Sequence, residues 1–193
     1  MVTFTQICGQ IQALLQEKET VLVAIDGNCT AGKTTLAAKL AQVFPCNVFH
    51  MDDFFLQSHQ RTPERFSEPG GNVDYRRFHR DVILPLTRQE AVSFQPYDCQ
   101  TASLQPHVDM PRHQLNIIEG TYSCHPFFGQ PYDLTVFLSV SEDVQRQRVL
   151  QRPQMLHQKF FTAWIPMEQA YFDTFSIADG CHLRCIGQEE LWD

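Results

Sequence analysis

Residues 26–35 of the chain read Asp26-Gly27-Asn28-Cys29-Thr30-Ala31-Gly32-Lys33-Thr34-Thr35. The stretch matches the pattern G-x-x-x-x-G-K-[ST], in which a glycine-rich loop cradles phosphate groups with its backbone N–H groups. Gly27 and Gly32 let the backbone close on a ligand, because neither residue carries a Cβ atom. In this pattern Lys33 reaches the β- and γ-phosphates, and the Thr34 hydroxyl completes the Mg²⁺ shell. We therefore expect residues 27–35 to bind ATP together with Mg²⁺.

The segments on either side of this loop agree with that interpretation. Residues 21–25 are a continuous apolar run rich in β-branched side chains, which predicts a buried parallel strand. Residues 34–41 are rich in Ala and Leu and have a helical apolar face. A strand, a glycine loop and a helix in this order aim a helix N-terminus at a phosphate. The alternative, a plain glycine turn with a solvated lysine, does not account for these flanks.

The composition is that of a globular protein of one domain. Of its 193 residues 43% are hydrophobic, which suits one domain over residues 1–193 with a full core. A net charge of −7 without any Lys/Arg block argues against a nucleic-acid surface. The chain opens without a signal sequence, no apolar run approaches about 18 residues, and the seven cysteines form no C-x-x-C pair. We therefore expect a cytoplasmic protein with reduced thiols and no membrane partner.

Five apolar runs alternate with segments of helical periodicity. The predicted strands are residues 21–25, 47–51, 115–118, 134–140 and 182–186. The predicted helices are residues 4–18, 34–41 and 167–175, and one more that Pro153 ends. This alternation predicts an α/β fold with a parallel sheet covered on both faces. Ligands of such sheets bind at the carboxyl ends of the strands, so we expect the chemistry at that edge.

Acidic residues follow two of the predicted strands at that edge. Asp52 and Asp53 close the second strand, where adjacent side chains of an extended chain point to opposite sides. One of these carboxylates can accept the proton of an attacking hydroxyl group, or hold Mg²⁺ through water. Glu119 closes the third strand and suits a Mg²⁺-binding role. The alternatives are a helix cap or loop pair for the two aspartates and a solvated strand end for the glutamate.

Two connections are longer than a parallel sheet requires. Residues 54–113 form an insertion that we expect to bind the acceptor substrate, and residues 146–165 form a candidate lid. Aromatic side chains of the insertion suit a flat ring held by stacking, although each taken singly is more often part of a core. They are Phe54, Phe55, Tyr75, Phe78 and Tyr97. Asp74, after the glycine turn at residues 70–71, caps a helix or binds paired sugar hydroxyls, and both roles are compatible.

Arginines are concentrated on the helix predicted before Pro153. Arg148 and Arg152 are four residues apart on one face, with Arg146 nearby. A lid that delivers an arginine to the transferring phosphoryl group stabilises its negative charge and speeds transfer by about 10³–10⁵. The alternative for each arginine is a solvated basic face. The chain lacks the N-K-x-D and L-S-G-G signatures, which weakens interpretations as a GTPase or a transporter ATPase.

Several segments together resemble one group of kinases. The loop, with residues 51–55, 71–75, 118–123 and 164–172, resembles uridine kinases and a wider group with nicotinamide riboside kinase, pantothenate kinase and phosphoribulokinase. The resemblance implies a P-loop NTPase three-layer sandwich, whose five-stranded parallel sheet has the order 2-3-1-4-5 and carries a small lid. It also implies that Asp52 faces the acceptor 5′-hydroxyl, that Asp74 holds ribose hydroxyls, and that Arg148 and Arg152 lie near the ATP phosphates. One position departs, because Ala102 stands where uridine kinases carry a histidine that helps to read the uracil ring.

Taken together, these observations predict a phosphotransferase that moves the γ-phosphoryl group of ATP to a primary hydroxyl of a small metabolite, with the nucleoside 5′-hydroxyl as the expected acceptor. The expected catalytic residues are Asp52, Lys33 and Arg148, and Arg152 joins the loop in binding the nucleotide. The expected substrate-binding residues are Asp52, Asp53, Phe54, Asp74, Tyr75 and Tyr97, and the expected Mg²⁺ ligands are Thr34 and Glu119. Two alternatives stay open: a non-catalytic ATP-binding regulatory protein, or a kinase of a non-nucleoside acceptor such as pantothenate or a sugar.

Overall fold

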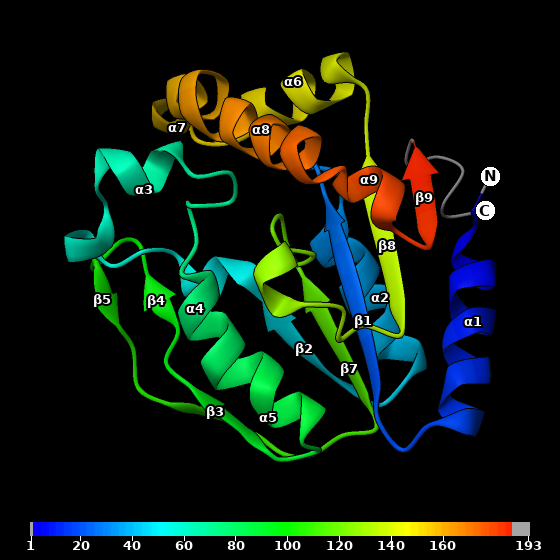
Figure 1. Cartoon of the computed structure of the whole chain (residues 1–193). Helices are drawn as coiled ribbons and strands as arrows, with labels where there is room; N and C mark the ends of the chain where they lie inside the picture. The colour runs from blue at the N-terminus through cyan, green and yellow to red at the C-terminus, as the bar shows by residue number, and fades with distance from the viewer. Residues whose placement is uncertain (1, 187–193) are drawn as a thin grey trace.

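The computed structural model describes residues 2–186, and its centre is a five-stranded parallel sheet (Figure 1). The strands are β1 (Val21–Gly27), β2 (Cys46–His50), β7 (Leu115–Glu119), β8 (Leu134–Ser139) and β9 (Leu183–Ile186). Their order across the sheet is β2-β7-β1-β8-β9, and each neighbouring pair is parallel. Numbered one to five along the chain, this is the order 2-3-1-4-5, so the predicted topology is confirmed.

Side chains of the central strand β1 alternate between two cores, as expected of a strand buried on both faces. Val21, Val23 and Ile25 pack with the apolar sides of α1 (Phe4–Glu17) and α2 (Lys33–Val43). Leu22 belongs to the second core, which is rich in aromatic rings from the insertion and from the C-terminal helices. The molecule therefore has three layers, with helices on either side of the sheet, as predicted.

Both helices of the first layer have boundaries that the sequence explains. At the start of α1, the Thr3 hydroxyl accepts from the Gln6 amide at 3.3 Å, and the Gln6 side chain accepts from the Thr3 amide at 3.0 Å. This reciprocal pair is a capping box. At the other end, α2 stops at Val43 because the residue before Pro45 is disfavoured in helical geometry.

The insertion between β2 and β7 is built from short elements. Its helical segments are η1 (Met51–Phe54), η2 (Ser58–Gln60), α3 (Pro63–Ser67), α4 (Tyr75–Phe78), η3 (His79–Ile83) and α5 (Leu84–Thr87). Strand β3 (Val92–Phe94) pairs with β6 (Val108–Met110), and β4 (Tyr97–Asp98) pairs with β5 (Ser103–Leu104), both antiparallel. The helical run from α4 to α5 buries Phe78, Val82 and Leu86 against the sheet, so it serves as the crossover to β7.

The C-terminal helices lie across the carboxyl ends of the strands (Figure 1). After β7 and the short turn η4 (Pro126–Phe128), they are α6 (Glu142–Leu150), α7 (Gln154–Lys159), η5 (Phe160–Trp164), α8 (Ile165–Phe175) and α9 (Ile177–Gly180). Pro153 separates α6 from α7, as predicted. These helices therefore sit above the edge at which ligands of parallel sheets bind.

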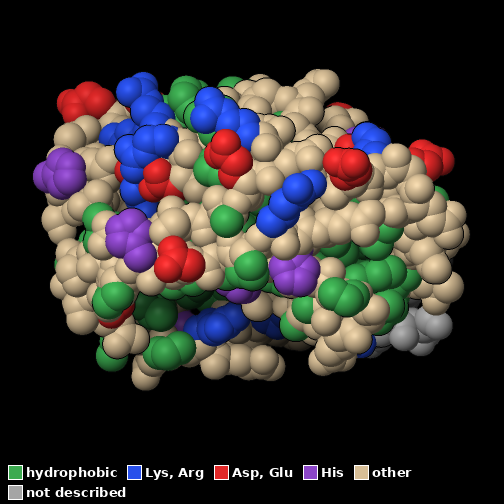
Figure 2. Space-filling view, turned by 90° about the horizontal axis from the view of Figure 1, so that it is seen from below, with side chains coloured by type: hydrophobic (Ala, Val, Ile, Leu, Met, Phe, Trp, Pro, Cys, Tyr) green, Lys and Arg blue, Asp and Glu red, His purple; other side chains and the backbone are tan. Residues whose placement is uncertain are grey.

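Figure 2 views the molecule from below, at the end where the strands begin. On this face Lys and Arg side chains lie beside Asp and Glu side chains, so both signs of charge are present together.

None of the helices between residues 2 and 186 combines the length and the apolar character that crossing a membrane would require.

Candidate active site

The phosphate-binding loop joins β1 to α2 at the carboxyl edge of the sheet. Gly27 has a φ of 136°, and a Cβ atom there would lie 1.8 Å from the Leu138 carbonyl oxygen, so this position requires glycine. Gly32, with a φ of 98°, directly precedes the first turn of α2. The N–H groups of a first helical turn have no carbonyl partner within the helix, and the helix dipole favours an anion beside them. The backbone at this edge is therefore suited to a phosphate group.

Lys33 folds back over the loop. The side chain is buried, and its Nζ atom donates to the carbonyl oxygens of Gly27 and Asn28, each at 2.8 Å. Nζ also lies 3.2 Å from the hydroxyl of Thr121, which follows β7 and itself donates to the Gly27 carbonyl at 3.0 Å. All three partners are neutral oxygens, so these bonds leave the positive charge of the ammonium group to attract an anion.

Glu119 connects the loop to the end of β7. One of its carboxylate oxygens, Oε1, accepts a hydrogen bond from the Thr34 hydroxyl at 3.0 Å and lies 2.6 Å from Nδ1 of His50. The hydrogen bond to Glu119 raises the pKa of His50 above its ordinary value, although partial burial opposes the rise. His50, at the end of β2, was not predicted as a site residue. The first turn of α2 and the ends of β7 and β2 thus bring a hydroxyl, a carboxylate and an imidazole to one point.

The residues present fit Mg²⁺. This ion prefers oxygen ligands and usually keeps several waters, binding through one or two carboxylates and the phosphates of a substrate. Thr34 and Glu119 supply a hydroxyl and a carboxylate 3.0 Å apart beside the loop. Within residues 2–186, no group of three or more His, Cys, Asp or Glu side chains could hold a metal by itself. The donor set therefore suits Mg²⁺ bound together with a nucleotide better than a permanently held ion.

Asp52 and Asp53 lie in the 3₁₀ turn η1. The prediction that they end an extended strand and point to opposite sides is wrong, because β2 stops at His50. Part of the surface of Asp52 is exposed, yet desolvation by nearby protein raises the pKa of its carboxyl group. The positive charge of Lys33 opposes this rise in pKa, and the negative charge of Glu119 adds to it. Desolvation also raises the pKa of Asp53. A raised pKa makes a carboxylate a better proton acceptor, which suits a general base.

Asp26 is a second residue of this site, after His50, whose role sequence reasoning missed. It is fully buried at the end of β1, where it accepts from the amides of Gly27 at 2.7 Å, Tyr122 at 3.2 Å and Cys124 at 2.9 Å. It also accepts from the Tyr171 hydroxyl on α8 at 2.9 Å. Burial raises its pKa, and these hydrogen bonds oppose the rise. An acid inside a buried strand is the available signal, because such a group needs several partners.

The aromatic rings predicted to stack on a ligand are mostly packed against protein. Phe54 is fully buried and stacks on Phe94, with ring centres 5.2 Å apart. Tyr75 is 8% exposed, with the Arg65 guanidinium 4.1 Å from its ring centre and the stacked His125 ring at 4.3 Å. Two groups this close cannot share one face, so both faces of Tyr75 are covered. Neither ring offers a free face to a flat ligand in this arrangement.

Asp74 and Tyr97 are engaged in the insertion's own hydrogen bonds. Asp74 is the N-cap of α4, where it accepts from the Arg77 amide at 3.0 Å, so the predicted cap is confirmed. Its other oxygen accepts from the Gln60 side-chain amide at 2.8 Å. The Tyr97 hydroxyl accepts from Arg61 at 3.3 Å, and its ring is buried. Their predicted contacts with a substrate stay predictions.

The structure separates the three arginines of the candidate lid. Arg148 donates from Nη1 to the carbonyl oxygen of Thr30 at 2.9 Å, which brings it to the phosphate-binding loop. Arg146 lies over the ring of Phe161, 5.3 Å from its centre. Arg152 is exposed, just beyond the end of α6. Of the three, Arg148 is therefore the arginine that the fold positions at the loop.

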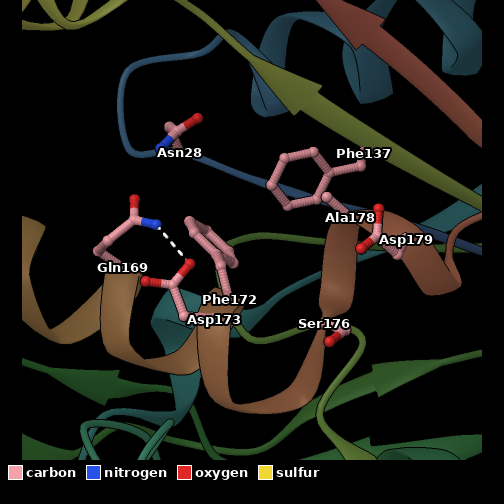
Figure 3. A pocket seen from close by; sticks show the side chains of 8 residues that line it. All are labelled: Asn28, Phe137, Gln169, Phe172, Asp173, Ser176, Ala178 and Asp179. Carbon is pink, nitrogen blue, oxygen red and sulfur yellow. Dashed lines mark hydrogen bonds between the residues drawn. The ribbon is translucent and has the colours of Figure 1, made fainter.

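A cavity of about 350 Å³ opens beside the loop, toward α8 and α9 (Figure 3). Asn28 of the loop and Phe137 of β8 line one side of it, and residues of the two helices line the other. Figure 3 shows Gln169 and Asp173 on α8 joined by a hydrogen bond of 2.7 Å. Lys33, Asp52 and Glu119 do not line this cavity. We therefore locate the site by the convergence of those charged groups, and the cavity is its neighbour.

Several solved structures are similar to this fold. No protein-family model and no curated protein sequence matches the chain. Among solved structures, a possible uridine kinase from Bacillus stearothermophilus has a TM-score of 0.67 at 20% identity, over 93% of this chain and 98% of that one. A putative fructose transport system kinase from Silicibacter sp. TM1040 has a TM-score of 0.67 at 23% identity, over 96% and 100%. The D-glycerate 3-kinase of Cryptococcus neoformans has a TM-score of 0.69 at 12% identity, over 95% and 94%.

A fourth solved structure has a lower TM-score. Phosphoribulokinase from Rhodobacter spheroides has a TM-score of 0.56 at 13% identity, over 82% of this chain and 68% of that one. At these identities the likeness concerns the fold, and it extends over nearly the whole of the described chain. The chain therefore has the P-loop kinase fold that uridine kinase-like and phosphoribulokinase structures share.

Proposed function

We propose that this protein is an ATP- and Mg²⁺-dependent kinase that phosphorylates a primary hydroxyl of a small metabolite. One observation carries the proposal: the loop hydroxyl of Thr34 bonds to Glu119 at the end of another strand, 3.0 Å away. The charges of Glu119 and Lys33 both act on the carboxyl group of Asp52. A site that only bound nucleotide would not need a further desolvated acid opposite its phosphate loop. A transfer site does, because the acceptor hydroxyl has to lose a proton.

The positions of the side chains assign them separate roles. Lys33 and the loop amides bind the β- and γ-phosphates, while Thr34 and Glu119 hold Mg²⁺, which supplies charge neutralisation on the phosphate oxygens. The bond between the γ-phosphorus and its bridging oxygen breaks, so that ADP leaves. The acceptor oxygen forms the new bond to phosphorus, and its proton passes to Asp52. Since the transition state is loose, the placement of the hydroxyl by Asp52 contributes more than its basicity.

Arg148 is the residue that we assign to the charge of the transferring group. Its guanidinium lies at the loop, bonded to the Thr30 carbonyl. Arg152 is exposed beyond the end of α6, and its expected contact with the nucleotide stays a prediction. The predicted lid at residues 146–165 thus contributes at least one arginine at the loop and a second outside it.

The acceptor is the least determined part of the proposal. The 5′-hydroxyl of a nucleoside is the acceptor that the resemblance favours, with Asp74 for the ribose. A small polyol is the second candidate, and it is favoured by the burial of Phe54 and the covered faces of Tyr75, because neither of these rings offers a free face to a base. Two of the neighbours in fold are named for a sugar and for glycerate, which places such acceptors in the panel to be tested.

The test is a coupled measurement of ADP release with Mg²⁺ and ATP. The panel holds uridine, cytidine, nicotinamide riboside, pantothenate, hexoses, pentoses and glycerate. Release that one class of hydroxyl compound stimulates supports the kinase and identifies the acceptor. Tight ATP binding with no stimulation by any member contradicts the kinase and supports the alternative, a regulatory ATP-binding protein.

A further inference from the structure

A buried glutamate outside the proposed reaction contacts the phosphate-binding loop. Glu168 lies on α8 with 3% of its surface exposed, far from the loop in sequence. Its Oε2 atom accepts from the amide of Cys29 at 2.9 Å, and its Oε1 atom accepts from the side-chain amide of Gln145 on α6 at 2.7 Å. Both carboxylate oxygens are thus engaged, one by the loop and the other by a neighbouring helix.

A second helix contacts the next peptide of the same loop. Arg148 on α6 donates to the Thr30 carbonyl at 2.9 Å, and Gln145 lies 3.4 Å from the Cys29 carbonyl oxygen. Thr30 has a φ of 62°, in the left-handed region that a β-branched residue adopts only when its surroundings enforce it. The two helices therefore hold the Cys29–Thr30 segment at the point where its backbone is strained.

A negatively charged side chain is unexpected at the buried position of Glu168 beside the phosphate-binding loop. Burying a carboxylate is costly unless it is hydrogen-bonded, and here it lies beside a loop suited to polyanions, which it repels. A neutral apolar residue would fill the space without either cost. Losing one of its hydrogen bonds would leave a buried amide or carboxylate unsatisfied, so the contact strongly favours a single loop conformation.

We propose that Glu168 is a positioning residue, which fixes the Cys29–Thr30 segment of the phosphate-binding loop and thereby ties the loop's affinity for nucleotide to the placement of α8. The Cys29 amide is bonded to α8, so its role is structural. The N–H groups of the first turn of α2, which have no carbonyl partner within the helix, are the ones left to bind phosphate. The inference rests on the proposed function only in that the loop binds a nucleotide.

The first test measures binding of Mg·ADP by calorimetry, without any acceptor. We expect Glu168→Ala to weaken binding by at least about tenfold, because the amide of Cys29 loses a charge-assisted bond. Glu168→Gln, whose amide oxygen can still accept from Cys29, should lose less than about threefold. Asp173→Asn is the matched control: it is exposed on the same helix, and it should bind as the wild type does.

A second measurement distinguishes positioning from general support of the fold. Burial, and after it the charge of Glu168, raises the pKa of the Cys29 thiol to about 12. Removing that charge in Glu168→Gln should therefore speed alkylation of Cys29 several-fold at pH 8, as measured by mass spectrometry. Exposed Cys99 is the internal standard for the reagent, and buried Cys185 reports on unfolding.

The outcomes separate the two proposals. Wild-type protein that binds no Mg·ADP contradicts the proposed function. Wild-type binding with an unchanged affinity in Glu168→Ala overturns the positioning role, and so does an equal rise of alkylation at Cys29 and Cys185. Weakened binding in Glu168→Ala, together with faster alkylation confined to Cys29, supports it.

Discussion

The phosphate-binding loop and the turn that carries Asp52 meet at one edge of the sheet, but their polar groups are held differently. Around the loop, charged side chains are bonded to the backbone: Asp26 accepts from three amides, and Lys33 donates to two carbonyls. Among residues 2–186, neither the Asp52 nor the Asp53 carboxylate accepts such a bond. That turn is placed by the burial of Phe54 and by bonds to its backbone carbonyls, from Arg77 to Asp53 at 3.0 Å and from the Asp74 amide to Phe54 at 2.7 Å, which leave both carboxylates without such a bond.

This difference follows from what each half of the site has to do. A loop that binds phosphate gains affinity when its shape is set before the ligand arrives, because ordering it later costs conformational entropy. A general base has to keep a lone pair free for the proton of the acceptor. Permanent hydrogen bonds thus favour the first function and would hinder the second. Substitutions can test whether the charged side chains of the two halves have these different functions.

The largest effect is expected at Lys33. Lys33→Met keeps much of the side-chain volume and removes the charge that the loop presents to phosphate. We expect kcat/KM to fall by about 10²–10³ or more, the loss typical of a single donor to a developing charge. Lys39→Met, on the same helix but further from the loop, is the control and should stay within threefold of the wild type. Nearly normal turnover in Lys33→Met would show that the loop amides suffice.

Asp52 should be the most sensitive position of the other half. Asp52→Asn retains the shape and removes the proton acceptor, so we expect kcat to fall by at least about 10², at the low end of general-base effects. Asp53→Asn, in the same turn, is the matched comparison and should cost much less. Steady-state kinetics with the acceptor identified by the screen would measure both. A larger loss at Asp53 would exchange the roles of the two residues.

Predictions from the sequence succeeded where the signal was local. The loop, the strand runs and the helix stops depend on residues within a few positions of one another. The order of the strands came from the resemblance to uridine kinases. The turn at Asp52 was not predicted, because no residue near it signals that the strand stops at His50 rather than at Met51.

Long-range partners could not be predicted. Asp26 bonds to Tyr171, 145 residues away, and Glu168 bonds to Cys29, 139 residues away. No periodicity encodes such pairs, because they depend on how α8 crosses the end of the sheet. The aromatic density of the insertion was visible, but composition does not reveal which face of a ring is covered, and the structure places Phe54 in the core.

His125 lies between the insertion and the residues around the phosphate-binding loop, and its protonation should have an effect of intermediate size on stability. Its ring stacks on Tyr75 of the insertion and on Tyr171, whose hydroxyl bonds to Asp26. Burial lowers the pKa of His125 to about 4, below the value of about 6.5 in an unfolded chain. The neutral ring is therefore fully stabilising above pH about 6.5, and this contribution is lost as the pH falls toward 4. The loss should be on the order of 2–3 kcal/mol over that window.

Denaturant unfolding at pH 7.5 and pH 4.5 measures this effect. His125→Asn cannot titrate, and its side-chain oxygen can replace Nδ1 as the acceptor for the Phe127 amide. We expect the wild type to lose more stability than the variant between the two pH values. Equal losses in the two proteins would show that protonation of His125 does not act at this junction.

The smallest effect is expected from removing the hydroxyl of Tyr97, a side chain on which the contribution of a polar bond can be separated from that of packing. Its hydroxyl accepts from Arg61 at 3.3 Å, a long bond, while Arg61 also donates to the Leu56 carbonyl at 2.9 Å. Tyr97→Phe should therefore cost no more than about 0.5–1.5 kcal/mol in the free energy of unfolding and change kcat less than about twofold. Tyr97→Ala removes a buried ring and should cost about 3–5 kcal/mol. If the two variants were equally destabilised, the hydroxyl rather than the ring would hold this part of the insertion, and the contrast with the loop would fail there.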